Sequence, residues 1–199
     1  DISLRVLEGL GADAVAVGRT EGFVAVDTED VSVEDEARYH EIVEQYGADA
    51  LVSTDGDGDR PLIVDETGRF HRGDVVGAIV ARWLRADFAA VPISTSDAID
   101  EFLGASTHLA KMLVEDLGLD SSDLPSFEGL ELVKTRTGSP FVIEAMMAAA
   151  ERGMKRIVGW EANGGFLIAS DFAIGEGVLR ALPTRDAMLP IVGVLLSTI

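Results

Sequence analysis

The chain has 199 residues, of which 47% are hydrophobic and 26% are charged, a composition typical of one or two globular domains and not of a disordered chain. Its formal net charge of −19 argues against nucleic acid and against an anionic membrane surface, so we expect neither as a partner. It contains no cysteine, which excludes a disulfide framework and cysteine-based chemistry and is consistent with the cytoplasm. Because it begins at Asp1 rather than at Met, we expect it to be part of a longer protein.

Helix and strand patterns alternate through residues 1–71. In chain order we expect a helix over residues 4–10, apolar strands at 14–17 and 23–26, a helix from Ser32 to Gly47, and strands at 48–52 and 62–64. Ser32 and Asp35 resemble a capping box at the start of the second helix, and Gly47 is a usual helix stop. The segment 65–68 has the composition of a turn.

The alternation restarts at Arg72 and continues to the end of the chain. We expect a helix capped by Asp74, a strand at 88–93, a helix after the loop 94–97, a strand at 130–133, a helix over 137–150, strands at 156–160 and 166–169, and a final helix over 183–196. Residues 104–129 break this rhythm and read as an insertion. The fold class is therefore α/β, with largely parallel sheets in two units, 1–71 and 72–199.

Three aspartates, Asp55, Asp57 and Asp59, alternate with glycines between the apolar runs 48–52 and 62–64. Glycines allow a tight loop in which the three carboxylates converge on one point. Such close negative charges repel one another unless a cation lies among them, and carboxylate oxygens suit a hard divalent cation. The loop therefore predicts a metal site.

Four interpretations of this loop are open, of which the simplest is a solvated acidic turn. The three aspartates and Glu66 match positions 1, 3, 5 and 12 of an EF-hand, but position 6 is Arg60 instead of glycine and the preceding segment reads as a strand. A phosphatase of the haloacid dehalogenase type would use Asp55 as nucleophile and Asp57 two residues later, although Asp59 stands where that family has Thr or Val. The fourth interpretation rests on segments elsewhere in the chain.

Four segments of the chain, in the same order, resemble those of the phosphohexomutases, the phosphomannomutase and phosphoglucomutase superfamily. They are Asp55–Arg60, Lys134–Pro140, Gly159–Gly165 and Thr184–Asp186. The resemblance implies two α/β/α-layered domains with mainly parallel mixed sheets, the second (1–71, partial) and the third (72–199) of four domains around a cleft.

By this resemblance, Asp55, Asp57 and Asp59 hold Mg²⁺, and Arg60 holds a phosphate oxygen beside it. Mg²⁺ is usually bound by a few carboxylates together with phosphate oxygens, and the planar guanidinium fork suits phosphate. Mg²⁺ is thus the expected cofactor.

The resemblance also assigns residues of the second unit. Glu161 and Asn163 match the sugar-recognition loop, in which many members carry His where this chain has Gly165. Arg136 stands where other members have a Lys or Arg that assists phosphoryl transfer, and the nearby Lys134 is a second candidate for this role.

The function implied is Mg²⁺-dependent interconversion of hexose 1-phosphate and hexose 6-phosphate, with mannose or glucose as the sugar, through a phosphoserine and a bisphosphate intermediate. The phosphoserine and the terminal phosphate-binding domain are absent from these 199 residues, so we expect the chain alone to be nearly inactive. Its expected partners are the phosphosugar substrate and flanking domains of the same protein. A haloacid-dehalogenase-like phosphatase and a non-catalytic Ca²⁺- or Mg²⁺-binding module are the alternatives.

Overall fold

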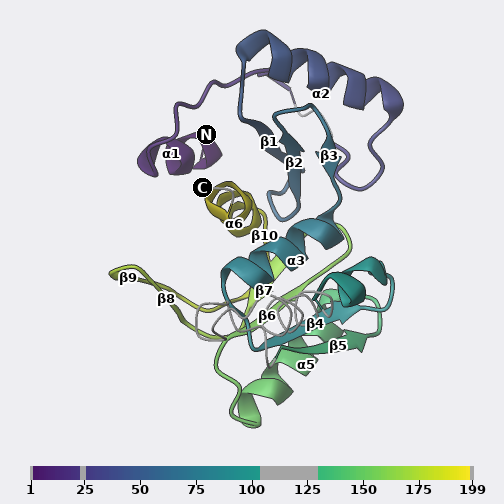
Figure 1. Ribbon diagram of the computed structural model, residues 1–199, viewed down its shortest axis with the longest axis vertical. Coiled ribbons are helices and arrows are strands. Elements are labelled where there is room, and N and C mark those ends of the chain that lie inside the picture. Colours follow the sequence, from purple (N-terminus) through teal and green to yellow (C-terminus); the bar gives the residue numbers. More distant parts are fainter. Residues whose placement is uncertain (1, 23–25, 104–129, 198–199) are drawn as a thin grey trace, which may run out of the picture.

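The computed structural model describes residues 2–22, 26–103 and 130–197, which form two main sheets and one two-stranded hairpin, with helices around them (Figure 1). Of the strand expected at 23–26, only residue 26 is among these residues, and the insertion expected at 104–129 lies wholly outside them. Each sheet belongs to one half of the chain, and α3 (Gly73–Trp83) and α6 (Met188–Ser197) lie between the two sheets.

The first sheet contains β1 (Ala50–Thr54), β2 (Pro61–Asp65) and β3 (Phe70–His71) in that order, all antiparallel. One face packs against α2 (Val33–Tyr46), where Tyr39 and Val43 contact Leu62 and Val64 of β2. The other face, through Ile63, packs toward α6 and α1 (Ile2–Gly9). Because alternate residues of β2 face opposite sides, one strand supports both helical layers.

The expected ends of α2 are confirmed. Ser32 caps the helix by accepting a hydrogen bond from the backbone N–H of Asp35, and its hydroxyl donates to the Asp35 carboxylate at 2.7 Å. Gly47 ends the helix in the left-handed conformation at φ 58°, which glycine adopts without strain.

The second sheet is mixed and has the strand order β10-β7-β6-β4-β5. Its strands are β4 (Phe88–Pro92), β5 (Glu131–Thr135), β6 (Ile157–Trp160), β7 (Phe166–Ile168) and β10 (Leu182–Asp186). β4 pairs in parallel with β5 and β6, while β7 pairs antiparallel with β6 and β10. The carboxyl ends of β4, β5 and β6 therefore meet at one edge of the sheet.

Helices cover both faces of this second sheet. On one face Ala78, Val80 and Ala81 of α3 pack against the sheet, and on the other Val142 and Met146 of α5 (Ser139–Glu151) do so. The α/β fold with a mixed sheet and helical layers is thus confirmed.

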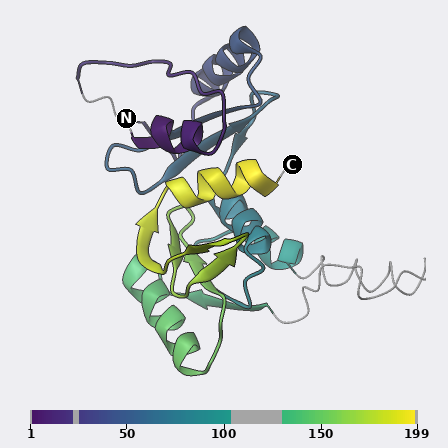
Figure 2. The ribbon, with the colours of Figure 1, turned by 90° about the vertical axis from the view of Figure 1, so that its left-hand side faces the viewer.

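The last helix joins the two halves of the chain. Ile191 of α6 packs with Val76 of α3 and Ile63 of β2, so a single apolar cluster contains residues of both halves. Figure 2 shows α6, in yellow, lying across the molecule between the two sheets.

The first sheet differs from the predicted parallel arrangement. The short loop 55–60 connects β1 to β2 directly, and a connection this short can join only antiparallel neighbours. Among the described residues of the second half, α5 connects β5 to β6, and both of these strands pair in parallel with β4.

Three further expectations were wrong in detail, and one hairpin was not predicted. Residues 14–17 form no strand, and Val15 is 61% exposed. Residues 183–186 belong to strand β10, so the final helix begins only at Met188. The hairpin of β8 (Phe172–Ile174) and β9 (Gly177–Leu179) was not predicted. Asp74 lies within the first turn of α3 and accepts a hydrogen bond from the N–H of Ser96, so it ties that helix to the loop after β4.

No helix among the described residues is both long enough and apolar enough to cross a bilayer.

Candidate functional site

The acidic loop is the turn of the β1–β2 hairpin. The backbone N–H of Asp55 donates to the carbonyl of Arg60 at 3.1 Å, which closes the loop. The Asp55 carboxylate then accepts hydrogen bonds from the N–H groups of Asp59 and Arg60, each at 3.1 Å. Gly58 takes a positive φ of 78°, so the glycine allows the chain to turn between Asp57 and Asp59.

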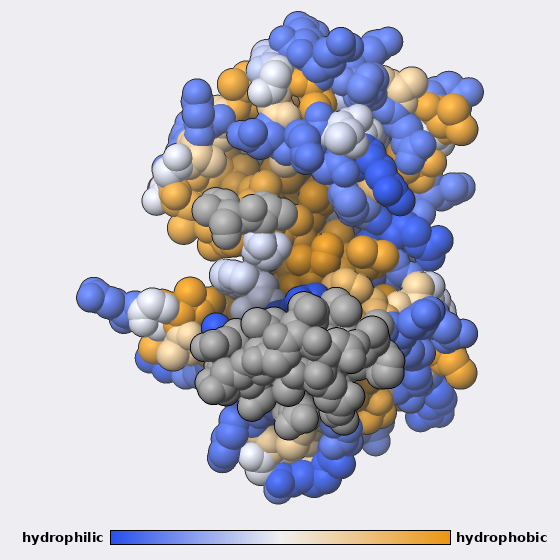
Figure 3. Space-filling view, viewed as in Figure 1, coloured by the Kyte–Doolittle hydropathy of each residue, from blue (hydrophilic) through white to orange (hydrophobic). Residues whose placement is uncertain are grey.

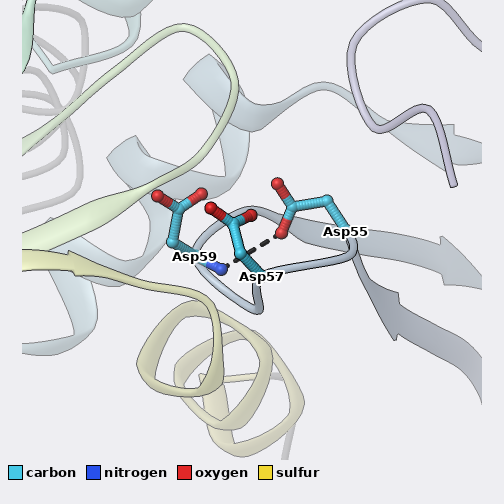
Figure 4. A group of neighbouring side chains, drawn as sticks. All are labelled: Asp55, Asp57 and Asp59. Atoms are coloured by element: carbon cyan, nitrogen blue, oxygen red, sulfur yellow. Dashed lines mark hydrogen bonds between the residues drawn. The ribbon is translucent and has the colours of Figure 1, made fainter. Parts of the chain in front are cut away.

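The three aspartates converge as predicted. Asp55, Asp57 and Asp59 each offer a carboxylate oxygen within 4.8 Å of the other two, and Figure 4 shows the three carboxylates on the same side of the loop. Asp59 Oδ1 is buried and has no hydrogen-bond partner. Burial, together with the charges of Asp57 and Asp55, raises the pKa of Asp59 although Arg185 and Arg60 oppose this.

A divalent cation fits this arrangement. The ligands are carboxylate oxygens, which hard cations prefer, and the buried Oδ1 of Asp59 accepts no hydrogen bond, with Arg60 Nε 3.6 Å away. The loop also joins two β-strands instead of two helices, so the EF-hand interpretation is wrong for this chain.

Arg60 lies beside the three carboxylates. Its Nη1 donates to Glu29 at 2.7 Å, while its Nε lies 3.7 Å from Asp55 and 3.6 Å from Asp59. An open hollow of about 520 Å³ adjoins this arginine and is lined by residues 26–30 with Asp55 and Arg60. Arg60 therefore links Glu29 to the acidic loop at the edge of this hollow.

The glycine-rich loop 161–165 follows β6 and folds back on itself. The N–H of Glu161 donates to the carbonyl of Gly165 at 3.1 Å, and the N–H of Gly165 donates to Asn163 Oδ1 at 3.0 Å. Gly164 takes φ 88°, so the loop needs glycine there. Glu161 itself is only 8% exposed, and Asn163 has its amide nitrogen left for other contacts.

This glycine-rich loop packs directly on the acidic loop. A Cβ atom at Gly165 would lie 3.1 Å from the Asp59 carbonyl oxygen, and one at Gly164 would lie 2.9 Å from Pro61. Residues about 100 positions apart in the chain thus form one site, with Glu161 close to the three aspartates.

Arg185 connects these two loops, and sequence reasoning did not select it as a site residue. Its Nη2 lies 2.6 Å from Asp59 Oδ2, and its Nη1 donates to Glu161 Oε2 at 3.2 Å. Burial alone would lower the pKa of this guanidinium, but Glu161 and Asp59 raise it overall. The only signal in the sequence was its place in the segment Thr184–Asp186, which says nothing about its contacts.

Lys134 and Arg136 lie at the same sheet edge but make other contacts. Lys134 pairs with Asp100 at 3.3 Å, and Arg136 stacks on the ring of Phe141 at 3.9 Å. Lys134 lies on β5, and β4 lies between β5 and β6 in the sheet. At the usual strand spacing, the backbones of Lys134 and Arg136 are therefore about 10 Å from that of Glu161. Among the described residues, neither is bonded to the acidic loop.

The fold and the site define an α/β protein in which three carboxylates converge where the two halves of the chain meet. Comparison with known proteins shows which family within this class the chain resembles. The family model described as phosphoglucomutase/phosphomannomutase, alpha/beta/alpha domain III, matches residues 122–196. The match begins inside the unit expected at 72–199, and the boundary at residue 71 stays a prediction.

Relatives along the whole chain agree with this match. A phosphomannomutase of Sinorhizobium fredii is 42% identical over 98% of this chain and 36% of its own length, and one of Salmonella muenchen is 38% identical over 100% and 36%. A phosphoglucosamine mutase of Cereibacter sphaeroides is 32% identical over 92% of this chain and 36% of its own length. The chain belongs to the phosphohexomutase superfamily, and it spans about a third of the length of these relatives.

Proposed function

We propose that this chain forms the cation-binding and sugar-binding part of a phosphohexomutase that interconverts hexose 1-phosphate and hexose 6-phosphate, with mannose or glucose as the sugar. The main observation behind the proposal is the packing of the acidic loop on the glycine-rich loop. In this arrangement Asp59 and Glu161 both form ion pairs with Arg185. The names of the relatives, phosphomannomutase above all, support this reaction.

Asp55, Asp57 and Asp59 would hold Mg²⁺, which when bound supplies positive charge to a phosphoryl group in transfer. Arg60 would exchange its contact with Glu29 for a phosphate oxygen, because the guanidinium can donate two parallel hydrogen bonds to that group. Glu161 would accept hydrogen bonds from sugar hydroxyls, with Asn163 adding a donor.

Lys134 and Arg136 would approach the substrate from the carboxyl end of β5, across the width of β4. Lys134 would first have to leave Asp100, and Arg136 would have to leave Phe141. Their part in phosphoryl transfer is therefore proposed on the sequence resemblance, with their place at the shared sheet edge as support.

We also propose residues 1–71 and 72–199 as the second and third domains of a four-domain protein, with a phosphoserine supplied from outside this chain. The relatives are long enough for such domains, since 36% of their length aligns here. On this proposal the chain by itself turns over hexose phosphates very slowly.

The test is a coupled assay of the full-length protein with mannose 1-phosphate, glucose 1-phosphate and glucosamine 1-phosphate, with and without Mg²⁺. We expect Mg²⁺-dependent formation of a 6-phosphate, and a loss of about 100-fold or more in kcat in the Asp57→Asn variant, because one cation ligand is removed. Asp49→Asn, an exposed carboxylate before β1, is the matched control and should keep full activity.

Unchanged activity in Asp57→Asn would refute the proposal. Release of inorganic phosphate without any hexose bisphosphate would instead identify a phosphatase. Tight Ca²⁺ binding that excludes Mg²⁺, measured by calorimetry, would favour a non-catalytic cation-binding module.

A further inference from the structure

Arg185 comes from β10, at the edge of the second sheet, and reaches two carboxylates with two different nitrogens. Nη2 contacts Asp59 Oδ2 at 2.6 Å, and Nη1 contacts Glu161 Oε2 at 3.2 Å. The side chain is 30% exposed, so most of it is fixed by its neighbours. One planar group therefore bridges the acidic loop and the glycine-rich loop.

The ion pair between Arg185 and Asp59 gives the two carboxylate oxygens of Asp59 different surroundings. Oδ2 accepts from Arg185, whereas Oδ1 is buried and has no hydrogen-bond partner, with Arg60 Nε 3.6 Å away. Holding Oδ2 fixes the rotation of the carboxylate and thereby the direction of Oδ1. A partner that holds one oxygen of a metal-binding carboxylate orients the other toward the metal.

Gly165 leaves the space that Arg185 occupies. A Cβ atom at residue 165 would lie 3.0 Å from Cδ and 3.1 Å from Cγ of Arg185, closer than ordinary van der Waals contact. A larger side chain at this position would push the arginine stem away from the two carboxylates. The glycine-rich loop and Arg185 thus depend on each other for their positions.

We propose that Arg185 is a positioning residue that orients Asp59 toward the cation and simultaneously holds Glu161 for the sugar, so that the two halves of the site keep one fixed separation. This inference rests on the proposed function, because it takes the three aspartates as the cation site. Arg185 itself need not touch substrate.

The geometry distinguishes positioning from a purely electrostatic role. Lysine at 185 keeps the positive charge but has one nitrogen, which cannot replace two nitrogens directed at two separate carboxylates. Arg185→Lys therefore removes the bridge at constant charge, whereas Arg185→Gln removes the bridge and the charge together.

The experiment is a calorimetric titration of the full-length protein with Mn²⁺, comparing the unaltered protein with Arg185→Lys, Arg185→Gln and a control, Arg180→Lys. Arg180 forms an exposed ion pair with Asp171 at 2.6 Å, so the control makes the same chemical change away from the site. We expect Arg185→Lys to weaken Mn²⁺ binding by about tenfold, as is usual when a residue orienting a metal ligand is lost. Arg180→Lys should stay within about twofold of the unaltered chain.

A double-variant measurement tests the bridge itself. Glu161→Gln should weaken Mn²⁺ binding in the unaltered chain, because Arg185 loses one of its two anchors. In the Arg185→Lys background, Glu161→Gln should change the Mn²⁺ affinity by a factor at least about threefold smaller, because Arg185 no longer connects Glu161 to Asp59. A difference of this size is typical of the coupling between neighbouring residues. The thermal unfolding midpoint of each variant shows whether a change in Mn²⁺ affinity comes from a general loss of stability.

The outcomes are distinct. Normal Mn²⁺ affinity in Arg185→Lys, or independent effects of Glu161→Gln and Arg185→Lys, would overturn the positioning role and leave the proposed function standing. Failure of the unaltered full-length protein to bind Mn²⁺ would overturn both.

Discussion

The Asp65 carboxylate organises the turn between β2 and β3. It accepts hydrogen bonds from the N–H of Thr67 at 2.9 Å, the N–H of Arg69 at 3.0 Å and the ring of His71 at 2.8 Å. Burial alone would raise the pKa of Asp65, but these hydrogen bonds and that of the Thr67 hydroxyl lower it from 3.8 to about 2. The charged form of this one side chain thus stabilises the folded state.

The lowered pKa predicts acid sensitivity. Asp65 contributes its stabilisation fully above pH 4, the unfolded-state pKa, and loses it as the pH falls toward the folded pKa of about 2. Urea unfolding should show that the free energy of unfolding falls by about 2 kcal/mol more between pH 5 and pH 2 in the unaltered chain than in Asp65→Asn. Asp49→Asn controls for the loss of one surface carboxylate, and equal pH dependence in the Asp65 and Asp49 variants would contradict the prediction.

Among the elements, the contact of α3 with β6 supports the site most directly. Gly77 of α3 faces the indole of Trp160, which is fully buried at the end of β6 and precedes Glu161. The indole Nε1 donates to the Asp74 carbonyl at 3.2 Å, which fixes the ring against the helix. The helix can approach the strand this closely only because residue 77 has no side chain.

Gly77→Ala should therefore destabilise the protein, although alanine normally favours a helix. Its Cβ would collide with the Trp160 ring, and overpacking of this kind costs about 1–3 kcal/mol. The midpoint of urea unfolding, followed by tryptophan fluorescence, measures the loss. Gly9→Ala at the end of α1, where a Cβ meets no atom within 4 Å, is the control and should be neutral or slightly stabilising.

At the scale of the whole molecule, α6 binds the two sheets together. Its residue Ile191 is 1% exposed and contacts both halves of the chain through Ile63 and Val76. Figure 3 shows apolar surface, in orange, continuing along the waist between the upper and lower parts of the molecule. The separation between the acidic loop and the glycine-rich loop therefore depends on apolar packing as well as on Arg185.

Ile191→Ala should weaken both halves at once. The lost packing should lower the free energy of unfolding by about 2–4 kcal/mol, as for other buried isoleucines. Hydrogen–deuterium exchange should show reduced protection in β2 and in α3 together. Reduced protection confined to α3 would show that α6 does not couple the sheets, and Val178→Ala on the exposed β8–β9 hairpin should change neither region.

Local patterns allowed much of the structure to be predicted from the sequence. The capping contact between Ser32 and Asp35, the helix end at Gly47 and the strands around the acidic loop follow from spacing within a few residues. Strand direction was harder, because pairing depends on the length of the connection and on the partner strand. Residues 183–186 were read as helix because their pairing with β7 is a long-range contact.

The candidate site divides in the same way. The sequence alone determined the convergence of Asp55, Asp57 and Asp59, because a glycine-rich turn between two strands forces neighbouring carboxylates together. Only the tertiary structure decided that Arg185 would meet both Asp59 and Glu161, and that Lys134 would pair with Asp100. Such contacts join residues far apart in the chain, and their positions are set by how sheets and helices pack, which no local spacing encodes.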